Sequence, residues 1–104
     1  YLIGKREFGL MKPSAILING SRGGVIDTNA LVDALNSKQL YGAGLDVFET
    51  EPLQLGHPLM NFDNVVLTPH AADATPEGLD YLNRDSVDHI INFIKGNPEG
   101  IYQQ

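Results

Sequence analysis

"AILINGSRGGVIDTNALVDALNSKQL", residues 15–40, places an apolar run, a glycine-rich turn and an amphipathic segment one after another. The apolar run at 15–19 is short and is bounded by Pro13 and Gly20. Short, continuously apolar runs of this kind predict strands that are buried on both faces. A strand followed by a tight turn and a helix is the repeating unit of α/β proteins, so this stretch indicates that fold class.

Residues 27–40 predict the helix of this unit. Asp27 or Thr28 can cap its first turn, because either side chain can accept a hydrogen bond from a free backbone N–H group. The apolar side chains of the segment recur at helical spacing and form one stripe: Leu31, Ala34 and Leu35.

The pattern of short apolar runs and helices continues along the chain. "IGKREFGLM" at 3–11 predicts the end of a helix that is stopped by Pro13. "GAGLDVF" at 42–48 and "VVLTPH" at 65–70 predict two more strands. About three strands alternating with helices predict an open parallel sheet whose faces are covered by helices.

A long C-terminal helix is predicted to follow the third strand. Thr75, Pro76 and Glu77 combine a capping side chain, a proline at the first helical position and an acid in the first turn. Gly96, followed by Asn97 and Pro98, predicts its end.

Composition narrows the classes of function. The 104 residues carry a formal net charge of −6, which disfavours binding to nucleic-acid backbones and anionic membranes. No apolar stretch approaches the ~20 residues that a membrane span needs. The chain has no cysteine, so it holds no disulfide or thiolate metal site, and we expect a cytoplasmic location.

No complete metal or phosphate-binding motif is present, and we expect no metal site. "GAG" at 42–44 begins like a dinucleotide-binding fingerprint, but Val47 stands where the third glycine should be. The motif also falls inside a predicted strand, whereas the fingerprint should open a helix.

Charged and polar side chains follow each predicted strand. Arg22 comes after the first strand, Asp46, Glu49 and Glu51 belong to the end of the second, and His70 ends the third. Because parallel strands end at the same edge of a sheet, these side chains should meet where ligands of open α/β sheets bind. An arginine can grip a carboxylate, a histidine can exchange a proton, and a carboxylate can fix the histidine tautomer and stabilise the imidazolium. The set suits proton-coupled chemistry on a small carboxylate-bearing substrate.

Each of these residues has a plainer explanation when taken alone. Arg22 could be a solvated loop residue, a lone histidine after a strand is more often structural, and acidic turns are usually solvated. His57, in a loop, and His89, on the long helix, are interpreted as structural. Only the joint arrangement of Arg22, Glu51 and His70 favours a functional site.

Three motifs, in this order and spacing, resemble one known family. "MKPSAILINGSRGGVID", "GAGLDVFETEP" and "NVVLTPHAADAT" closely resemble the D-isomer-specific 2-hydroxyacid dehydrogenases, a family that includes phosphoglycerate dehydrogenase. The resemblance covers nearly the whole chain. It implies that residues 1–104 are the C-terminal half of an NAD(P)-binding domain, including its long C-terminal helix. The fold would be the second half of a Rossmann-type, doubly wound parallel sheet.

The resemblance also implies what this stretch lacks. The glycine-rich phosphate loop and the substrate domain of the family are absent from these residues. We therefore expect a fragment, or part of a longer polypeptide, with little activity alone and with an open sheet edge at 15–19 that promotes self-association. The full-length protein would be a homodimer.

Residue roles follow from the matched positions. Arg22 would bind the carboxylate and carbonyl of a 2-oxo acid, and its glycine neighbours would let substrate and nicotinamide approach the backbone. Glu51, the acid before Pro52, would be the carboxylate partner of His70, and Glu49 is not the matching position. His70 would be the general acid in reduction and the base in oxidation.

The implied cofactor contacts lie around the same residues. Asp46 would face the nicotinamide amide, and Gly20 and Ser21 would line the nicotinamide side. Arg22 and His70 also belong to this cofactor-binding set, as does Ala72. Ala72 and Asp73 stand where the family often has glycines.

The implied function is hydride transfer between NAD or NADP and C2 of a small D-2-hydroxy acid or 2-oxo acid. The alternative is a non-catalytic binding or oligomerisation module, or an inactive fragment, that keeps the fold. The intact arginine, glutamate and histidine count against that alternative. The resemblance does not choose the acid, or NAD over NADP.

Overall fold

The computed structural model describes residues 1–97, which fall into two compact units. The first unit is Tyr1–Ala72, and the second begins at Asp73. The first unit contains the sheet and all the candidate site residues, so most of the description concerns it.

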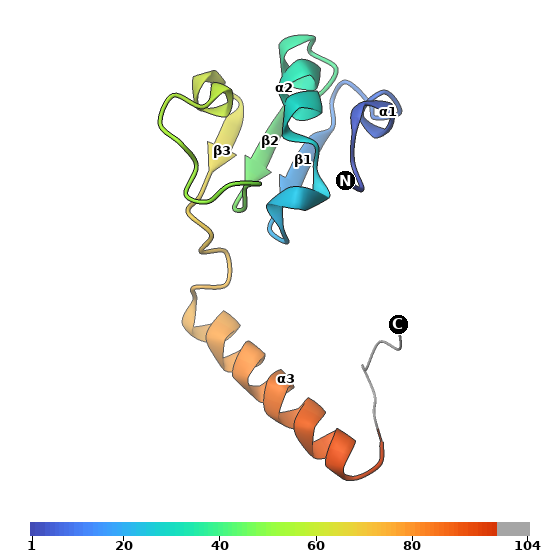
Figure 1. The fold of residues 1–104 in the computed structure, drawn as a ribbon, viewed down its shortest axis with the longest axis vertical. Coiled ribbons are helices and arrows are strands. Elements are labelled where there is room, and N and C mark those ends of the chain that lie inside the picture. Colours follow the sequence, from blue (N-terminus) through green and yellow to red (C-terminus); the bar gives the residue numbers. More distant parts are fainter. Residues whose placement is uncertain (98–104) are drawn as a thin grey trace. The chain divides into compact units, whose positions relative to one another are not determined.

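The first unit is built on a three-stranded parallel sheet with the strand order β1-β2-β3 (Figure 1). Its strands are β1 (Ile16–Asn19), β2 (Gly42–Leu45) and β3 (Val65–Leu67). The prediction of about three parallel strands in an α/β fold is therefore confirmed. Each strand is shorter than predicted. The residues that follow β2 and β3 therefore leave the sheet at its carboxyl edge, and their side chains can form a site there.

Two helices of this unit pack with the sheet around one hydrophobic core. They are α1 (Lys5–Phe8) and α2 (Thr28–Asn36), and the short 3₁₀ turns η1 (Gly23–Val25) and η2 (Pro58–Asn61) complete the unit. The largest fully buried side chains of the core come from both helices, from η2 and from the segment between α2 and β2: Phe8, Leu31, Leu59 and Leu40. The predicted stripe of α2 is confirmed, since Leu31, Ala34 and Leu35 are all buried.

The prediction that the first strand is buried on both faces is wrong for the described chain. Ile16 is 61% exposed and Ile18 is 80% exposed, and Val66 on the same side of β3 is 66% exposed. The core lies on the other face of the sheet, against α1 and α2. A continuous apolar run indicates that both faces of a strand can be buried. Whether both are buried depends on whether other elements pack against each face.

Local signals place the helix ends. Asp27, and not Thr28, caps α2, because its carboxylate accepts a hydrogen bond from the N–H of Ala30 at 3.0 Å. The expectation that Pro13 stops the first helix is wrong, since α1 ends at Phe8 and Gly9 caps it. A glycine directly after the helix ended it before the proline was reached.

The second unit contains α3 (Pro76–Ile94). Its start is as predicted, with the Thr75 hydroxyl accepting a hydrogen bond from the N–H of Gly78 at 3.0 Å and with proline at the first position. Gly96 follows the helix with φ of 75°, as a C-terminal glycine should. Pro98, which was expected to reinforce this end, lies outside the described residues. None of the described helices is both long and apolar enough to cross a membrane.

Candidate active site

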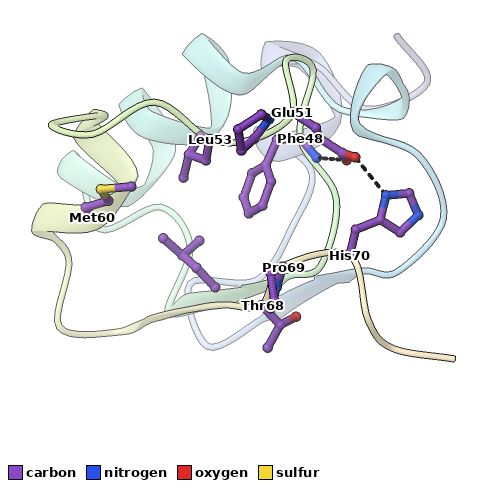
Figure 2. A pocket seen from close by; sticks show the side chains of 9 residues that line it. Phe48, Glu51, Leu53, Met60, Thr68, Pro69 and His70 are labelled. Atoms are coloured by element: carbon purple, nitrogen blue, oxygen red, sulfur yellow. Dashed lines mark hydrogen bonds and ion pairs between the residues drawn. The ribbon is translucent and has the colours of Figure 1, made fainter. Parts of the chain in front are cut away.

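The centre of the candidate site is a hydrogen-bonded pair formed by Glu51 and His70. Glu51 follows β2 and His70 follows β3, and Nδ1 of the imidazole lies 2.7 Å from Oε2 of the carboxylate (Figure 2). The other carboxylate oxygen, Oε1, accepts a hydrogen bond from the N–H of Phe48 at 2.9 Å. The carboxylate is thus fixed at both oxygens, and the imidazole is fixed against it.

The electrostatics of the pair follow from these contacts. The hydrogen bond from His70, followed by that from the Phe48 N–H, lowers the pKa of Glu51 below its usual range. An ionised carboxylate can only accept hydrogen bonds, so Nδ1 of His70 carries the proton that is shared with Glu51. Nε2 is left free, and Figure 2 shows it pointing away from Glu51. Its exposure lets an external group reach the free nitrogen, since the His70 side chain is 44% exposed.

Arg22 lies after β1 and is exposed. Its Nη1 donates a hydrogen bond to the carbonyl of Ser21 at 2.7 Å. Within residues 1–97 it forms no ion pair, although its positive charge contributes to lowering the pKa of Glu51. The structure therefore brings Glu51 and His70 into contact. Within residues 1–97 no hydrogen bond or ion pair joins Arg22 to either of them, and its exposed guanidinium lies at the same edge of the parallel sheet.

The loop that carries Arg22 is ordered by Asn19, for which sequence analysis gave no role. Asn19 is buried, and its Oδ1 accepts hydrogen bonds from the N–H of Ser21 at 3.1 Å and from the Ser21 hydroxyl at 2.9 Å. Its Nδ2 donates to the carbonyl of Arg22 at 3.0 Å. An asparagine two residues before a serine at a strand end is a known turn signal, and it could have been recognised.

Glycine is required at position 23 because of the protein's own backbone. A Cβ atom there would lie 1.9 Å from the carbonyl carbon of Phe48, which is closer than any real contact. At Gly24 a Cβ would have no neighbour within 4 Å, and at Gly20 it would lie 3.9 Å from Cβ of Ala72. The expectation that ligands explain the glycines around Arg22 therefore needs correction at Gly23, where the approaching group is the segment after β2.

Asp46 is a buried carboxylate directly after β2, and it has the partners that such a group needs. Its Oδ1 accepts hydrogen bonds from the Thr68 hydroxyl at 2.6 Å and from the N–H of Ala71 at 2.9 Å. Its Oδ2 accepts one from the N–H of Ala72 at 2.9 Å. The Thr68 hydroxyl, followed by the Ala71 N–H, lowers the pKa of Asp46, so the group is ionised near neutral pH.

The other acidic and histidine candidates have structural partners. Glu49 accepts hydrogen bonds from the N–H of Thr28 at 3.0 Å and from the Tyr1 hydroxyl at 2.9 Å, and the Thr28 contacts lower its pKa. His57 caps η2 by accepting from the N–H of Leu59. His89 lies 3.4 Å from a carboxylate oxygen of Asp85 on α3. In the part of the chain that the structure describes, no group of His, Asp and Glu could hold a metal ion.

A cavity of about 550 Å³ lies beside the pair. Apart from Glu51 and His70, most of the side chains around it are apolar, with Phe48, Leu53 and Met60 projecting toward it (Figure 2). The free nitrogen of His70 points away from these residues. The cavity therefore borders the side of the pair opposite the nitrogen that can exchange a proton.

Comparison with known proteins gives one consistent family. Residues 1–72 match the family model for the D-isomer specific 2-hydroxyacid dehydrogenase, NAD binding domain. The chain is 48% identical over 99 residues to glyoxylate/hydroxypyruvate reductase B of Enterobacter sp. (strain 638), a match that covers 95% of the chain and 31% of that protein. It is 46% identical, with the same coverage, to the enzyme of that name from Salmonella newport (strain SL254). The chain thus spans about a third of the length of these curated relatives.

Solved structures agree with the sequence matches. A D-isomer specific 2-hydroxyacid dehydrogenase from Xanthobacter autotrophicus Py2, in complex with NADPH and MES, superposes with a TM-score of 0.72 at 39% identity, over 93% of this chain and 39% of that one. An NADPH-dependent glyoxylate/hydroxypyruvate reductase from Sinorhizobium meliloti, in complex with NADP and malonate, gives 0.70 at 36% identity, over 88% and 28%. With the parallel sheet and the family model in agreement, the chain belongs to the D-isomer specific 2-hydroxyacid dehydrogenase family.

Proposed function

We propose that the protein is an NAD(P)-dependent oxidoreductase that interconverts a small 2-oxo acid and the D-2-hydroxy acid. Residues 1–104 would form the C-terminal part of its NAD(P)-binding domain. The observation that carries the proposal is the contact of 2.7 Å between Glu51 and His70 at the carboxyl edge of the sheet. The names of the relatives support the reaction class, and the exposed Arg22 at the same edge of the sheet supports a substrate with a carboxylate.

His70 is the proton-exchanging residue of the proposed reaction. In the reducing direction its Nε2–H donates a proton to the oxygen that forms at C2 of the 2-oxo acid, and in the oxidising direction neutral Nε2 removes it. Glu51 accepts a hydrogen bond from Nδ1–H in both directions, so it keeps the ring in one tautomer and one orientation. Glu51 acts through His70 and does not exchange the proton itself.

Arg22 is the proposed binding residue for the substrate carboxylate. A guanidinium presents two parallel N–H groups that match the two oxygens of a carboxylate. Its present partner is the carbonyl of Ser21, a neutral acceptor on the surface. A charged substrate is a stronger acceptor, so binding would turn the guanidinium from Ser21 toward the substrate.

The residues of the predicted cofactor set fit the nicotinamide end of NAD(P). Oδ2 of Asp46 accepts one hydrogen bond and keeps a second lone pair, which suits an amide N–H of the ligand. A Cβ atom at Gly20 would lie 3.9 Å from Cβ of Ala72, so the turns after β1 and β3 approach each other at these residues, and Ser21 is the next residue along the chain. When bound, the cofactor would supply or accept the hydride. The chain contains no complete glycine-rich fingerprint for the pyrophosphate, which other residues of the enzyme would have to hold.

The test is oxidation of NADH and NADPH by the full-length protein with glyoxylate and hydroxypyruvate as substrates. Hydroxyacetone, which has a similar carbonyl but no carboxylate, is the matched control substrate. We expect turnover with a 2-oxo acid, a preference for one cofactor, and little turnover with hydroxyacetone because Arg22 would have no carboxylate to bind. Absence of turnover with every 2-oxo acid, in a folded protein that binds cofactor, would instead support the non-catalytic alternative.

A further inference from the structure

We propose that Asp46 is a positioning residue, whose carboxylate holds the turn at 68–72 in the conformation that presents His70 to Glu51. The expected effect of Asp46 on catalysis rests on the proposed function, whereas its expected effect on the orientation of the His70 ring is independent of that function.

The contacts of Asp46 bracket His70 along the chain. The Thr68 hydroxyl, two residues before the histidine, and the N–H of Ala71, directly after it, both donate to Oδ1. The N–H of Ala72 donates to Oδ2. One buried carboxylate therefore fixes both ends of the turn on which His70 stands.

The conformation of His70 needs such support. Its φ is 55°, in the left-handed region that residues other than glycine adopt rarely. A strained residue keeps such a conformation when the surrounding structure over-determines it. The neighbouring N–H groups that bind Asp46 supply that constraint, because the following residues can reach the carboxylate only if the chain turns at His70.

Two carboxylates from the segment after β2 thus have different tasks. Glu51 contacts the ring of His70, and Asp46 contacts its backbone neighbours. Glu51 is itself held by the N–H of Phe48 in the same segment. The segment after β2 consequently fixes both the imidazole ring of His70 and the backbone around it. These two sets of contacts together set the direction in which Nε2 points.

An asparagine at position 46 could not replace the aspartate. Its single carbonyl oxygen can accept the hydrogen bonds that Oδ1 now accepts. Its NH₂ group would then face the N–H of Ala72, and two donors would oppose each other. The turn would have to open on the side that follows His70.

The experiment measures the tautomer of His70 by ¹⁵N NMR in the full-length protein without cofactor or substrate. Wild type should show the Nδ1–H form bound to Glu51, and Asp46→Asn should show a mixture of both tautomers. The matched control for loss of charge is Asp33→Asn, since Asp33 is an exposed residue of α2, and it should resemble wild type. Turnover is then measured on the same samples, and Asp46→Asn should lose at least about tenfold in kcat.

A second pair of variants separates positioning from contact with the cofactor or from poor folding. Thr68→Val removes only the hydroxyl donor to Asp46, and Thr68→Ser restores it. The valine variant should shift the His70 tautomer and lower kcat without weakening cofactor binding, and the serine variant should recover both. A wild-type His70 spectrum in folded Asp46→Asn, or in Thr68→Val if the first variant does not fold, would overturn the proposal. If the His70 spectrum shifts in these variants but the wild-type protein shows no turnover, the result would contradict the proposed function and not the positioning role of Asp46.

Discussion

Gly23→Ala is expected to separate the loop of Arg22 from the segment after β2. The added Cβ would lie 1.9 Å from the carbonyl carbon of Phe48 and 2.3 Å from the backbone nitrogen of Glu49. Ordinary contact begins near 3.4 Å, so the two backbone segments must move apart by about 1.5 Å. Because backbone cannot rotate aside as a side chain does, we expect the upper end of the usual overpacking cost, about 3 kcal/mol.

Catalysis should suffer as well, because the displaced segment leads directly to Glu51. A misplacement of about 1 Å at an active site can cost on the order of 10²-fold in rate. The assay is urea unfolding of the full-length protein, together with NAD(P)H-linked reduction of the best 2-oxo acid. Gly24→Ala is the matched control, since its Cβ would meet nothing within 4 Å, and it should stay within about 0.5 kcal/mol of wild type. Equal stability and turnover in the two variants would refute the packing argument.

Three further outcomes are expected. Arg22→Lys should raise KM for the 2-oxo acid at least about tenfold, because a lysine ammonium cannot make the two parallel hydrogen bonds that a guanidinium makes to a carboxylate. An unchanged KM in steady-state kinetics would contradict this. The pKa of Glu51 is lowered in the folded state, so its contribution to stability is present above its usual pKa of about 4.3 and is lost as the pH falls through the lowered value. Urea midpoints of wild type and Glu51→Gln should therefore differ at pH 7 and converge in acid, and a constant difference would be the contrary result. Ile18→Lys should reduce self-association of the 104-residue chain in sedimentation, because Ile18 is 80% exposed on the edge strand β1.

The pairing of Glu51 with His70 was predictable because it depends on topology. Once three apolar runs are assigned to a parallel sheet, the residues that follow them must lie at one edge. The choice between Glu49 and Glu51 came from the family resemblance, and the structure gives the two residues different partners. The start of α3 at Pro76 was predictable for a different reason, since the capping residue, the proline and the acid that mark it lie within one turn of the chain.

Other features depend on contacts that no local pattern contains. The hydrogen bonds from Ala71 and Ala72 to Asp46 join residues about 25 positions apart, and they form only when β2 and β3 are adjacent. The contact that makes glycine necessary at position 23 has the same origin. Residues of β1 were wrongly predicted to be buried on both faces. The apolar character of Ile18 indicates that its side chain can be buried, but it does not show whether another element covers it.

The role of His70 is the central claim, and a single-turnover measurement tests it most directly. Full-length wild type and His70→Ala are each saturated with the preferred reduced cofactor and mixed with the 2-oxo acid, and cofactor oxidation is followed at 340 nm. Removing a general acid should slow this step by about 10²–10⁴-fold. Cofactor affinity, measured by fluorescence titration, should change by less than about twofold, because the free nitrogen of His70 acts on the substrate oxygen. A His70→Ala enzyme that oxidises the cofactor at nearly the wild-type rate would contradict the assignment of His70 as the proton donor.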